Sequence, residues 1–445
     1  MASFSFGAGN ARKLATIPLY AAGRIFTLLV PRTPDEWVFG CAVGIGDGAL
    51  ALWEVAAADD RPAVWLVGSK REATDAAARG IRAVPKRSLQ GLWRTARARV
   101  IVVTHGFGDV NRYAVSGGFV VQLWHGIPLK RIGLDSPETL RVPGALAATP
   151  AAGVVRTLLR TMYRRAARRI RILPAASHLV RGRLESAFGL RDADVPVTGE
   201  PRVDVLSRGT AAVRRAEARA AIGRAVPRAT PDARFVLYAP TWRDGAPDPA
   251  VPTAHEWTSI VDVLTRHDAT LLVRSHPLGA GEYRPPFPTD RVLPLGSDLV
   301  TDVTPLLPGL DALVTDYSSL AFDAALVPLP TLFLAPDVEE YARRRGFYGA
   351  YADVAGDDCA VEWGQTTAQL DALLGDAAEH GRRADRAAAL SARVHAFHDG
   401  RNAERVYRAI LAGAVPAPAA GVADALRGAA GRRGPDDARP REGTG

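Results

Sequence analysis

Nine short, continuous apolar runs recur along this chain, and helix-like stretches such as Ala49–Ala58 and Arg71–Ala78 lie between them. Continuous rather than alternating apolar runs are typical of strands buried on both faces of a parallel sheet. Strands that alternate with helices predict an α/β fold with helices on both faces of the sheet. The runs are Trp37–Cys41, Ala63–Gly68, Val100–Thr104 and Gly118–Leu123 in the first half, then Phe235–Ala239, Ala269–Val273, Val292–Leu295, Ala312–Thr315 and Thr331–Leu334 in the second.

The pattern occurs twice, which predicts two doubly wound, Rossmann-like domains that face a cleft. The length of 445 residues suits two or three domains. We expect an N-terminal segment over 1–34, a first domain over 35–195 and a second over 196–412. Residues 413–445 are rich in Ala, Pro, Gly and Arg without periodicity, so we predict a disordered tail.

The apolar stretch Leu14–Val30 fits neither a secretory signal nor a membrane span well, because Arg24 interrupts it and no small-residue cleavage site follows. Two interpretations stay open. One is an interfacial helix with Lys13, Arg24 and Arg32 at its polar edges; the other is a helix that packs on the core.

Polar residues follow four of the apolar runs directly. Ligands of open α/β sheets bind beyond the carboxyl ends of the strands, so these positions are the first candidates for a site. They combine hydroxyls, cations and two histidines, a set suited to a phosphorylated ligand. The segments are Trp124–Lys130, Pro240–Asp244, Arg274–Pro277 and Asp316–Ser319.

Each of these residues also has a structural interpretation. Ser318 and Ser319 precede an apolar helix-like stretch, where they predict either an anion site at the helix N-terminus or a simple helix cap. Arg243 can clamp a phosphate or pair with Asp244. A single histidine is more often structural, but one histidine at a strand end in each half, His125 and His276, favours acid–base or phosphate-binding work.

The net charge of +9 comes almost entirely from arginine, and seven arginines lie in the interval Val155–Ile172. Helical spacing places them on one broad face, opposite apolar residues, so we predict a basic amphipathic helix over 155–172. Such a helix favours an anionic membrane surface, with Arg164, Arg165, Arg168 and Arg169 as the binding residues. The alternative is a helix whose apolar face packs on the core and whose arginines are only solvated.

Other chemistries lack a signature. The chain has no phosphate-binding P-loop and no His-Glu-x-x-His zinc motif, and the glycines from Gly40 to Gly46 do not match the dinucleotide fingerprint. Cys41 and Cys359 cannot build a disulfide framework or a four-thiolate zinc site, which favours a reducing compartment. We therefore expect no metal and no cofactor, and the absence of a recognition module speaks against nucleic acid as a partner.

The loop motifs together resemble the CDP-glycerol glycerophosphotransferase family, the bacterial primases and polymerases of teichoic acid and related polymers. The resemblance runs from about residue 35 to residue 410, in the family's order, and implies a GT-B type fold. The matching segments are Trp37–Gly40, Trp124–Gly133, Gly199–Asp204, Leu237–Asp244, Arg274–Pro277, Thr315–Asp323, Tyr341–Tyr348 and His398–Asn402.

The resemblance implies transfer of a polyol phosphate from a CDP-polyol such as CDP-glycerol to a hydroxyl of a lipid-linked acceptor, with release of CMP, at the cytoplasmic face of a bacterial membrane. His125 looks like the base for the acceptor hydroxyl, within a loop that includes Gly126 and Lys130. His276 looks like a partner of the donor pyrophosphate. The implied donor-binding residues are Thr241, Arg243, Asp316, Ser318, Ser319 and Asp323.

Two other functions remain open. One is a GT-B glycosyltransferase that uses a nucleotide sugar, and the other is a non-catalytic relative that binds a membrane or a polyanion. The sequence does not decide between glycerol and ribitol, between primase and polymerase, or among oligomeric states.

Overall fold

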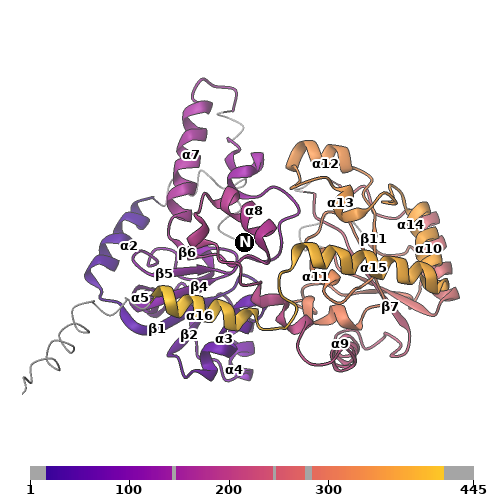
Figure 1. The fold of residues 1–445 in the computed structure, drawn as a ribbon, viewed down its shortest axis with the longest axis horizontal. Coiled ribbons are helices and arrows are strands. Elements are labelled where there is room, and N and C mark those ends of the chain that lie inside the picture. Colours follow the sequence, from indigo (N-terminus) through magenta and orange to yellow (C-terminus); the bar gives the residue numbers. More distant parts are fainter. Residues whose placement is uncertain (1–16, 143–146, 244–246, 276–282, 415–445) are drawn as a thin grey trace, which may run out of the picture.

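The computed structural model describes residues 17–142, 147–243, 247–275 and 283–414, which form two α/β domains side by side (Figure 1). Each domain contains one sheet, and all the registered strand pairs of both sheets are parallel. The predicted fold class, with two parallel sheets and helices, is therefore confirmed. The first sheet comprises β1 (Thr33–Gly40), β2 (Ala63–Val67), β3 (Ala83–Pro85), β4 (Ala98–Val103), β5 (Phe119–Gln122) and β6 (Ile170–Ile172); the second comprises β7 (Arg234–Ala239), β8 (Ala269–Val273), β9 (Val292–Pro294), β10 (Ala312–Thr315) and β11 (Thr331–Phe333).

The strand order is β3-β2-β1-β4-β5-β6 in the first sheet and β11-β10-β7-β8-β9 in the second. In each sheet the chain runs outward from the first strand in one direction and then returns to build the other side. The order therefore reverses between β1 and β4 and between β7 and β10. Crevices for ligands form at such reversal points, beyond the carboxyl ends of the strands.

All nine predicted apolar runs coincide with strands, and the structure adds the short edge strands β3 and β6. The expected basic helix over 155–172 is wrong at its end, because α7 (Ala152–Ala167) stops earlier and residues 170–172 form β6. Ile170 and Ile172 are buried on either side of exposed Arg171, and both pair with β5. This period-two pattern belongs to a strand.

Helices cover both faces of each sheet. In the first domain, α3 and α16 pack on one face and α7 and α8 on the other; in the second, α10 and α14 cover one face and α9 and α11 the other. Side-chain caps begin several of them, for example Ser69 at α4 and Thr253 at α10. The remaining helices are α2 (Ile17–Leu29), α3 (Asp47–Ala58), α4 (Lys70–Ala78), α5 (Leu89–Arg97), α8 (His178–Phe188), α9 (Ala211–Ala225), α10 (Ala254–Arg266), α11 (Leu320–Ala325), α12 (Val338–Arg345), α13 (Ala352–Ala355), α14 (Trp363–Gly375), α15 (Ala377–Val394) and α16 (Asn402–Ala414).

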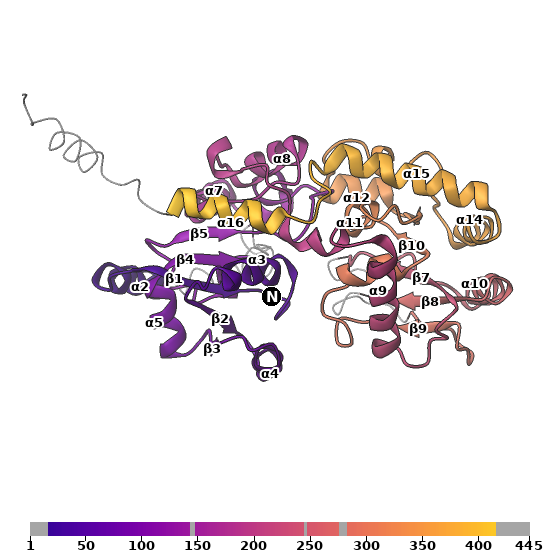
Figure 2. The same ribbon diagram turned by 60° about the horizontal axis from the view of Figure 1, so that its bottom comes forward.

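The last helix returns to the first domain. After α15 in the second domain the chain crosses back, and α16 lies along the first sheet (Figure 2). Its residues Val406, Tyr407 and Ile410 are buried against Trp37 and its neighbours. The expectation that the second domain extends to residue 412 is therefore wrong for α16. Most of the predicted tail, residues 415–445, lies outside the described residues.

Apolar contacts and backbone hydrogen bonds join the domains. Ile127 and Leu129 of the first domain belong to the same buried cluster as Phe322 and Phe333 of the second. Close by, the Arg131 N–H donates to the Gly346 carbonyl at 3.0 Å and the Tyr348 N–H donates to the Leu129 carbonyl at 3.0 Å. The loop after β5 is thus held firmly against the second domain.

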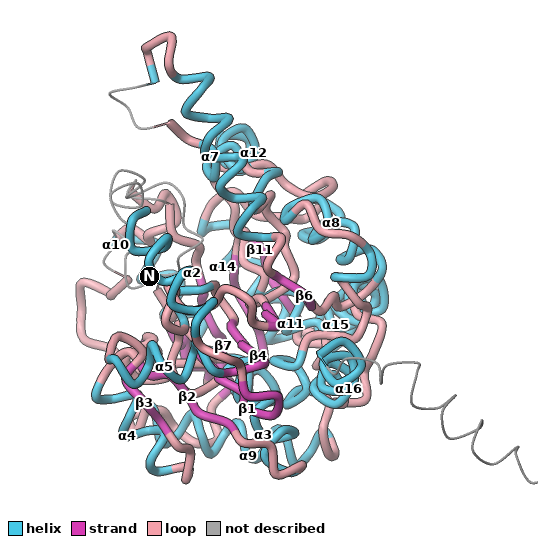
Figure 3. The backbone as a smooth tube through the Cα atoms, turned by 90° about the vertical axis from the view of Figure 1, so that its left-hand side faces the viewer, coloured by secondary structure: helices cyan, strands magenta, loops and turns pink. Residues whose placement is uncertain are grey.

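Two helices stand at the outer side of the first domain. The helix α7 projects beyond the rest of the molecule (Figures 1 and 3). Its Leu159, Tyr163 and Ala167 are buried, while Arg156, Arg160, Arg164 and Arg165 are exposed. The apolar face of α7 therefore packs on the core, as one of the two interpretations expected.

The N-terminal helix α2 is mostly exposed, with Leu19, Ile25, Leu28 and Leu29 all more than half accessible to solvent. Its inner side packs through Tyr20, whose ring contacts Tyr113, and through Phe26. Across the described ranges, no helix combines the length and the hydropathy that a membrane span requires.

Candidate active site

The candidate site lies where the loops at the two reversal points face each other. From the first domain come the loops after β1, β4 and β5; from the second come the loops after β7 and β10. Parallel strands place their carboxyl ends at one edge of the sheet, so residues distant in sequence meet there.

The loop after β5 carries His125 across to the second domain. Trp124 and Gly126 both have positive φ, 62° and 130°, so the chain turns sharply on either side of the histidine. A Cβ placed on Gly126 would lie 2.9 Å from the Ser319 Oγ atom. Only glycine lets the His125 loop approach the start of α11 this closely.

A second histidine, His105, lies parallel to His125. It follows β4, and the two ring centroids are 4.3 Å apart with an interplanar angle of 1°. The Thr104 hydroxyl lies 2.8 Å from Nδ1 of His105. Sequence reasoning missed His105; its place directly after the Val100–Thr104 run was the available signal.

Both imidazoles favour the neutral form. Burial, then the charges of His105 and Arg202, lower the pKa of His125 well below its usual range, while a backbone hydrogen bond with Thr104 acts in the opposite direction. Burial likewise lowers the pKa of His105. The Nδ1 atom of His125 is buried without a hydrogen-bond partner among the described residues.

Arg202 joins the two domains beneath these loops. Its guanidinium pairs with Asp47 of α3 at 3.2 Å and with Asp323 of α11 at 2.5 Å, and it also donates to the Thr304 hydroxyl at 3.2 Å. Burial opposes its charge, but Asp323 and Asp47 raise the pKa of Arg202 above its ordinary value. In the sequence, Arg202 belongs to the Gly199–Asp204 motif, which by itself predicts no role for it.

A buried ion-pair network occupies the reversal point of the second sheet. Asp316 accepts hydrogen bonds from the Thr241 N–H at 2.9 Å and from Arg243 at 2.8 Å. Arg243 also forms a bidentate pair with Asp337, at 2.8 and 3.0 Å. Tyr317 donates to the same carboxylate at 2.9 Å. Arg243 is thus held by Thr241, Asp316 and Asp337, and these contacts favour positioning of the Thr241 loop.

Ser318 and Ser319 begin α11, as the sequence predicts. The Ser318 Oγ atom accepts a hydrogen bond from the Leu320 N–H at 3.2 Å, so it serves as a local cap. Ser319 makes no such side-chain bond at the helix start and faces Gly126. Asp323, which follows in the same helix, pairs with Arg202. The two serines therefore have different local environments.

Lys130 also reaches across the domain boundary. It forms an isolated antiparallel bridge with Phe347, and its Nζ atom lies 5.9 Å from the centroid of the Tyr341 ring. Its positive charge lowers the pKa of Asp316, although burial, the largest effect, raises it. Lys130, in the loop after β5, therefore also contributes positive charge to the loop after β10, which carries Asp316.

Two predicted residues fall outside the described residues, namely His276 and Asp244. The structure does describe Arg274, two residues before His276. Arg274 donates to the carbonyls of Leu295, Val300 and Thr301 at 2.8 to 3.2 Å, so it holds the loop after β9.

Several buried polar atoms at this junction have no hydrogen-bond partner within the described ranges. Buried polar groups normally find a partner, so such atoms mark positions where a ligand or water completes the bonding. The atoms are Nδ1 of His125, Oε2 of Glu200, Oγ1 of Thr241 and Oδ1 of Asp323. Burial raises the pKa of Glu200 to about 8.

A cavity of about 670 Å³ opens beside Arg202, between α3 and α4 of the first domain and the segments 201–208 and 300–305 of the second. Its lining contains more carboxylates than arginines, which is unfavourable for a diphosphate. Neither Thr241 nor Ser319 is among the residues that line it.

One group of possible metal ligands occurs among the described residues. Cys41, Asp47 and His105 place ligand atoms within 4.8 Å of one another. Burial and the Asp47 charge raise the pKa of the Cys41 thiol, and Asp47 already pairs with Arg202. These residues are therefore engaged in the protein's own contacts.

Two doubly wound domains whose strand-end loops face each other, with His125 and Ser319 on opposing loops, define a fold of the GT-B type. The chain belongs to the family described as CDP-glycerol:poly(glycerophosphate) glycerophosphotransferase, whose family model matches residues 30–412.

Individual relatives match part of the chain. The teichoic acid poly(glycerol phosphate) polymerase of Staphylococcus epidermidis is 28% identical over 239 residues, which cover 52% of this chain and 31% of the relative. The teichoic acid glycerol-phosphate transferase of Staphylococcus aureus is 28% identical over 241 residues, 52% of this chain and 56% of the relative. The teichoic acid ribitol-phosphate polymerase TarL of Staphylococcus aureus is 25% identical over 231 residues, 50% of this chain and 38% of the relative.

The matched region thus spans between 31% and 56% of the length of these curated relatives. Among solved structures, the wall teichoic acid polymerase TagF superimposes with a TM-score of 0.68 at 20% identity, over 91% of this chain and 97% of that chain. A histidine-to-asparagine variant of TagF, soaked with CDPG, gives a TM-score of 0.67 at 20% identity, over 91% and 96% of the two chains. This similarity shows the fold.

Proposed function

We propose that this chain is an enzyme that transfers a polyol phosphate from a CDP-polyol donor, CDP-glycerol in the first instance, to a hydroxyl of a lipid-linked acceptor. CMP is the second product. The reaction would serve teichoic-acid-like polymer synthesis. Membership of the glycerophosphotransferase family supports the class of donor.

One observation carries the proposal. The His125 loop of the first domain meets the Ser319 end of α11 in the second, at a distance that only Gly126 permits. A base from one domain therefore lies next to hydroxyl groups from the other. This arrangement suits a reaction in which an acceptor held by the first domain attacks a donor held by the second.

His125 is the proposed base. Its lowered pKa keeps the ring neutral near pH 7, and the unpartnered Nδ1 atom is the one available to accept a proton. A bound diphosphate would raise this pKa towards neutrality, since negative charge favours the imidazolium form. Base catalysis of this kind contributes roughly 10²- to 10⁴-fold to a rate.

The donor's phosphates are proposed to bind Thr241, Ser318, Ser319 and His276. The Thr241 hydroxyl is buried and unpartnered among the described residues, which leaves it available. Arg243 and Asp316 would position this loop, and Asp323 would act through Arg202. Lys130 and Gly126 would shape the acceptor side.

In the proposed step, the acceptor oxygen forms a bond to the phosphorus that carries the polyol. The bond from that phosphorus to the bridging oxygen breaks, and CMP leaves with that oxygen. The acceptor proton passes to His125. Hydroxyl, backbone and cationic groups would stabilise the charge that develops on the phosphate oxygens.

The direct test measures nucleotide release by the purified chain with a lipid-like acceptor. We expect CMP from CDP-glycerol or CDP-ribitol and no release from UDP- or GDP-sugars.

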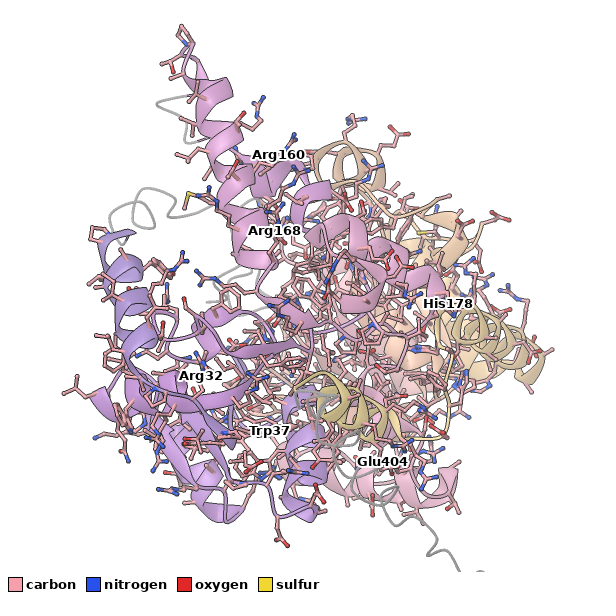
Figure 4. All side chains as sticks on the ribbon, turned by 60° about the vertical axis from the view of Figure 1, so that its left-hand side comes forward. Arg32, Trp37, Arg160, Arg168, His178 and Glu404 are labelled. Carbon is pink, nitrogen blue, oxygen red and sulfur yellow. The ribbon has the colours of Figure 1, made fainter. Side chains whose placement is uncertain are left out.

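His125→Ala should lower the rate by at least about a hundredfold without unfolding the protein, and His276→Ala should do the same. The exposed His178, labelled in Figure 4, supplies the control variant His178→Ala, which should retain activity. Near-normal turnover by His125→Ala would contradict the assignment, and release from a nucleotide sugar alone would indicate a glycosyltransferase.

We further propose peripheral association with the cytoplasmic face of the membrane through α7 and the residues after it. The exposed arginines of this region and the exposed apolar side chains of α2 support this location. Neutralising Arg164, Arg165, Arg168 and Arg169 together should weaken sedimentation with anionic vesicles. Unchanged binding would contradict the membrane location and leave the chemistry unaffected.

A further inference from the structure

A pocket rich in arginine opens at the edge of the first sheet that lies opposite the catalytic loops. Its volume is about 400 Å³, and Arg99, Arg168, Arg169 and Arg171 line it together with Gly117 and Gly118. These residues lie within the first two residues of β4 and β6 or just before β5 and β6. Because parallel strands share one direction, this edge is remote from the loops that carry His125 and Ser319.

The positive charge of this pocket has no carboxylate partner among the described residues. By contrast, Arg382, Arg383 and Arg386 of α15 all pair with Asp358, at 3.1, 3.0 and 2.5 Å. Arg99 donates only to a backbone carbonyl, that of Ala414, at 2.7 and 3.0 Å.

Further arginines border the pocket and increase its charge. Burial and then the Arg24 charge lower the pKa of Arg169, and burial and then the Arg99 charge lower the pKa of Arg32 to about 10. Mutually repelling cations at a partly buried site favour an anion that neutralises them. Guanidinium groups are well matched to phosphate oxygens, which they bind through paired N–H donors.

The surroundings of the pocket indicate which phosphate fits. It lies between α2, which carries Arg24, and the foot of α7, where Figure 4 shows Arg168. Next to Arg24, the helix α2 exposes apolar side chains, among them Ile25 at 61% and Leu28 at 78% accessibility. A soluble anion would gain no binding energy from these apolar side chains. A lipid would, because its acyl chains meet apolar side chains while its phosphate stays at the polar boundary.

We propose that this arginine pocket binds the phosphate of an anionic phospholipid headgroup while α2 and α7 contact the membrane surface. The inference rests on the membrane association proposed above and is independent of the phosphotransfer. Binding in this pocket differs from attraction by a diffuse positive surface. The arginines around the pocket should contribute more to the affinity for anionic vesicles than equally charged residues elsewhere on α7.

The test compares two double variants that lose the same charge. Arg168→Gln with Arg171→Gln removes two exposed arginines of the pocket, and Arg156→Gln with Arg160→Gln removes two exposed arginines from α7 outside it. Binding of the full chain to phosphatidylcholine vesicles with and without phosphatidylglycerol is measured by flotation. We expect the pocket variant to lose about tenfold more affinity for the phosphatidylglycerol vesicles than the α7 variant.

Equal losses in the two variants would overturn the pocket and leave only diffuse electrostatic attraction. If the unmodified chain bound phosphatidylglycerol vesicles no better than phosphatidylcholine vesicles, the proposed membrane association would be overturned as well. Release of CMP from CDP-glycerol with a soluble acceptor, measured in parallel, should be unaffected in both variants, so failure of the proposed reaction is visible separately.

A second arm distinguishes a headgroup from free phosphate. Inorganic phosphate is titrated against the chain without vesicles, and the thermal midpoint is followed for the unmodified chain and the pocket variant. We expect a weak, pocket-dependent shift that a short-chain phosphatidylglycerol exceeds. Saturation by inorganic phosphate at lower concentrations than the lipid would assign the pocket to a soluble anion and overturn the lipid proposal.

Discussion

His125 and His105 illustrate how the sheet order creates a pair that the sequence separates. The two residues follow β5 and β4, which are neighbours in the first sheet, so their rings come to lie parallel at 4.3 Å. The sequence makes His125 a candidate because one histidine, His125 or His276, stands at a strand end in each half. His105 becomes a candidate only in the structure, because the pairing of β4 with β5 places its ring beside that of His125.

A third buried histidine should control stability in acid. His395 lies between α15 and α16 and its Nε2 atom is 3.0 Å from the Phe322 carbonyl of α11. Burial lowers its pKa to about 4. A histidine with a lowered pKa in the folded state leaves stability intact above its unfolded pKa and reduces it as the pH falls towards the folded value.

We therefore expect the free energy of unfolding to fall between about pH 7 and about pH 5, with about 2 kcal/mol of this loss due to His395. Urea denaturation of the unmodified chain and of His395→Gln at both pH values measures the contribution. The variant should lose correspondingly less stability on acidification. An equal loss in the two proteins would show that His395 does not titrate in this range.

At the scale of elements, two family-like motifs prove to be one structural unit. Asp204, in the 3₁₀ segment Pro201–Leu206, accepts hydrogen bonds from the backbone N–H groups of Asn402 and Ala403, at 2.9 and 2.8 Å. These groups begin α16. Residues almost two hundred positions apart thus fix the return of the last helix to the first domain.

Gly199 lets the Asn402 side chain at the start of α16 approach the backbone closely. It has a φ of 76°, and a Cβ at this position would lie 2.0 Å from the Asn402 side-chain oxygen. Gly209 has a similar φ of 67° with nothing within 4 Å, so it supplies a matched control. Gly209→Ala should cost only the left-handed backbone strain, about 1 kcal/mol.

We expect Gly199→Ala to cost about 1 to 3 kcal/mol more than Gly209→Ala, since the added methyl displaces Asn402 and weakens the start of α16. Chemical denaturation of both variants gives the difference. Similar costs for the two substitutions would mean that the contact with Asn402 adjusts freely.

For the whole molecule, Arg202 links the two domains through buried ion pairs. It lies between Asp47 of the first domain and Asp323 of the second, and the three side chains are 12%, 8% and 1% exposed. Removing the arginine leaves two buried carboxylates without their partner. Loss of one partner of a buried ion pair typically costs about 3 to 5 kcal/mol.

Arg202→Met should therefore lower the free energy of unfolding by about 3 kcal/mol or more, as measured by urea denaturation. Arg208 provides the comparison, because its side chain is 46% exposed and its ion pairs with Glu54 and Asp204 are longer, at 3.5 and 3.6 Å. Arg208→Gln should cost less than about 1 kcal/mol. A small effect of Arg202→Met would indicate that water reaches the two carboxylates.

The predictable part of the fold rests on local apolar content. All nine continuous runs became strands, because a strand buried on both faces needs apolar residues at every position. β3 and β6 were missed because each contains only two apolar residues, with Pro85 and Arg171 as the third residue. The helix predicted over 155–172 is wrong beyond residue 167, because Ile170 and Ile172 have the two-residue spacing of a strand, whereas the prediction followed the arginines at 168, 169 and 171.

By itself the sequence determined two parallel-sheet domains and the strand-end loops that carry the candidate chemistry, since both follow from local pattern. Only the tertiary structure decided which loops face each other, that Arg243 is held by two aspartates, that Arg202 joins the domains, and that α16 returns to the first domain. Those features depend on contacts between residues far apart in the chain. Such contacts are set by strand order and by the burial of charge, and neither leaves a periodic signal in the sequence.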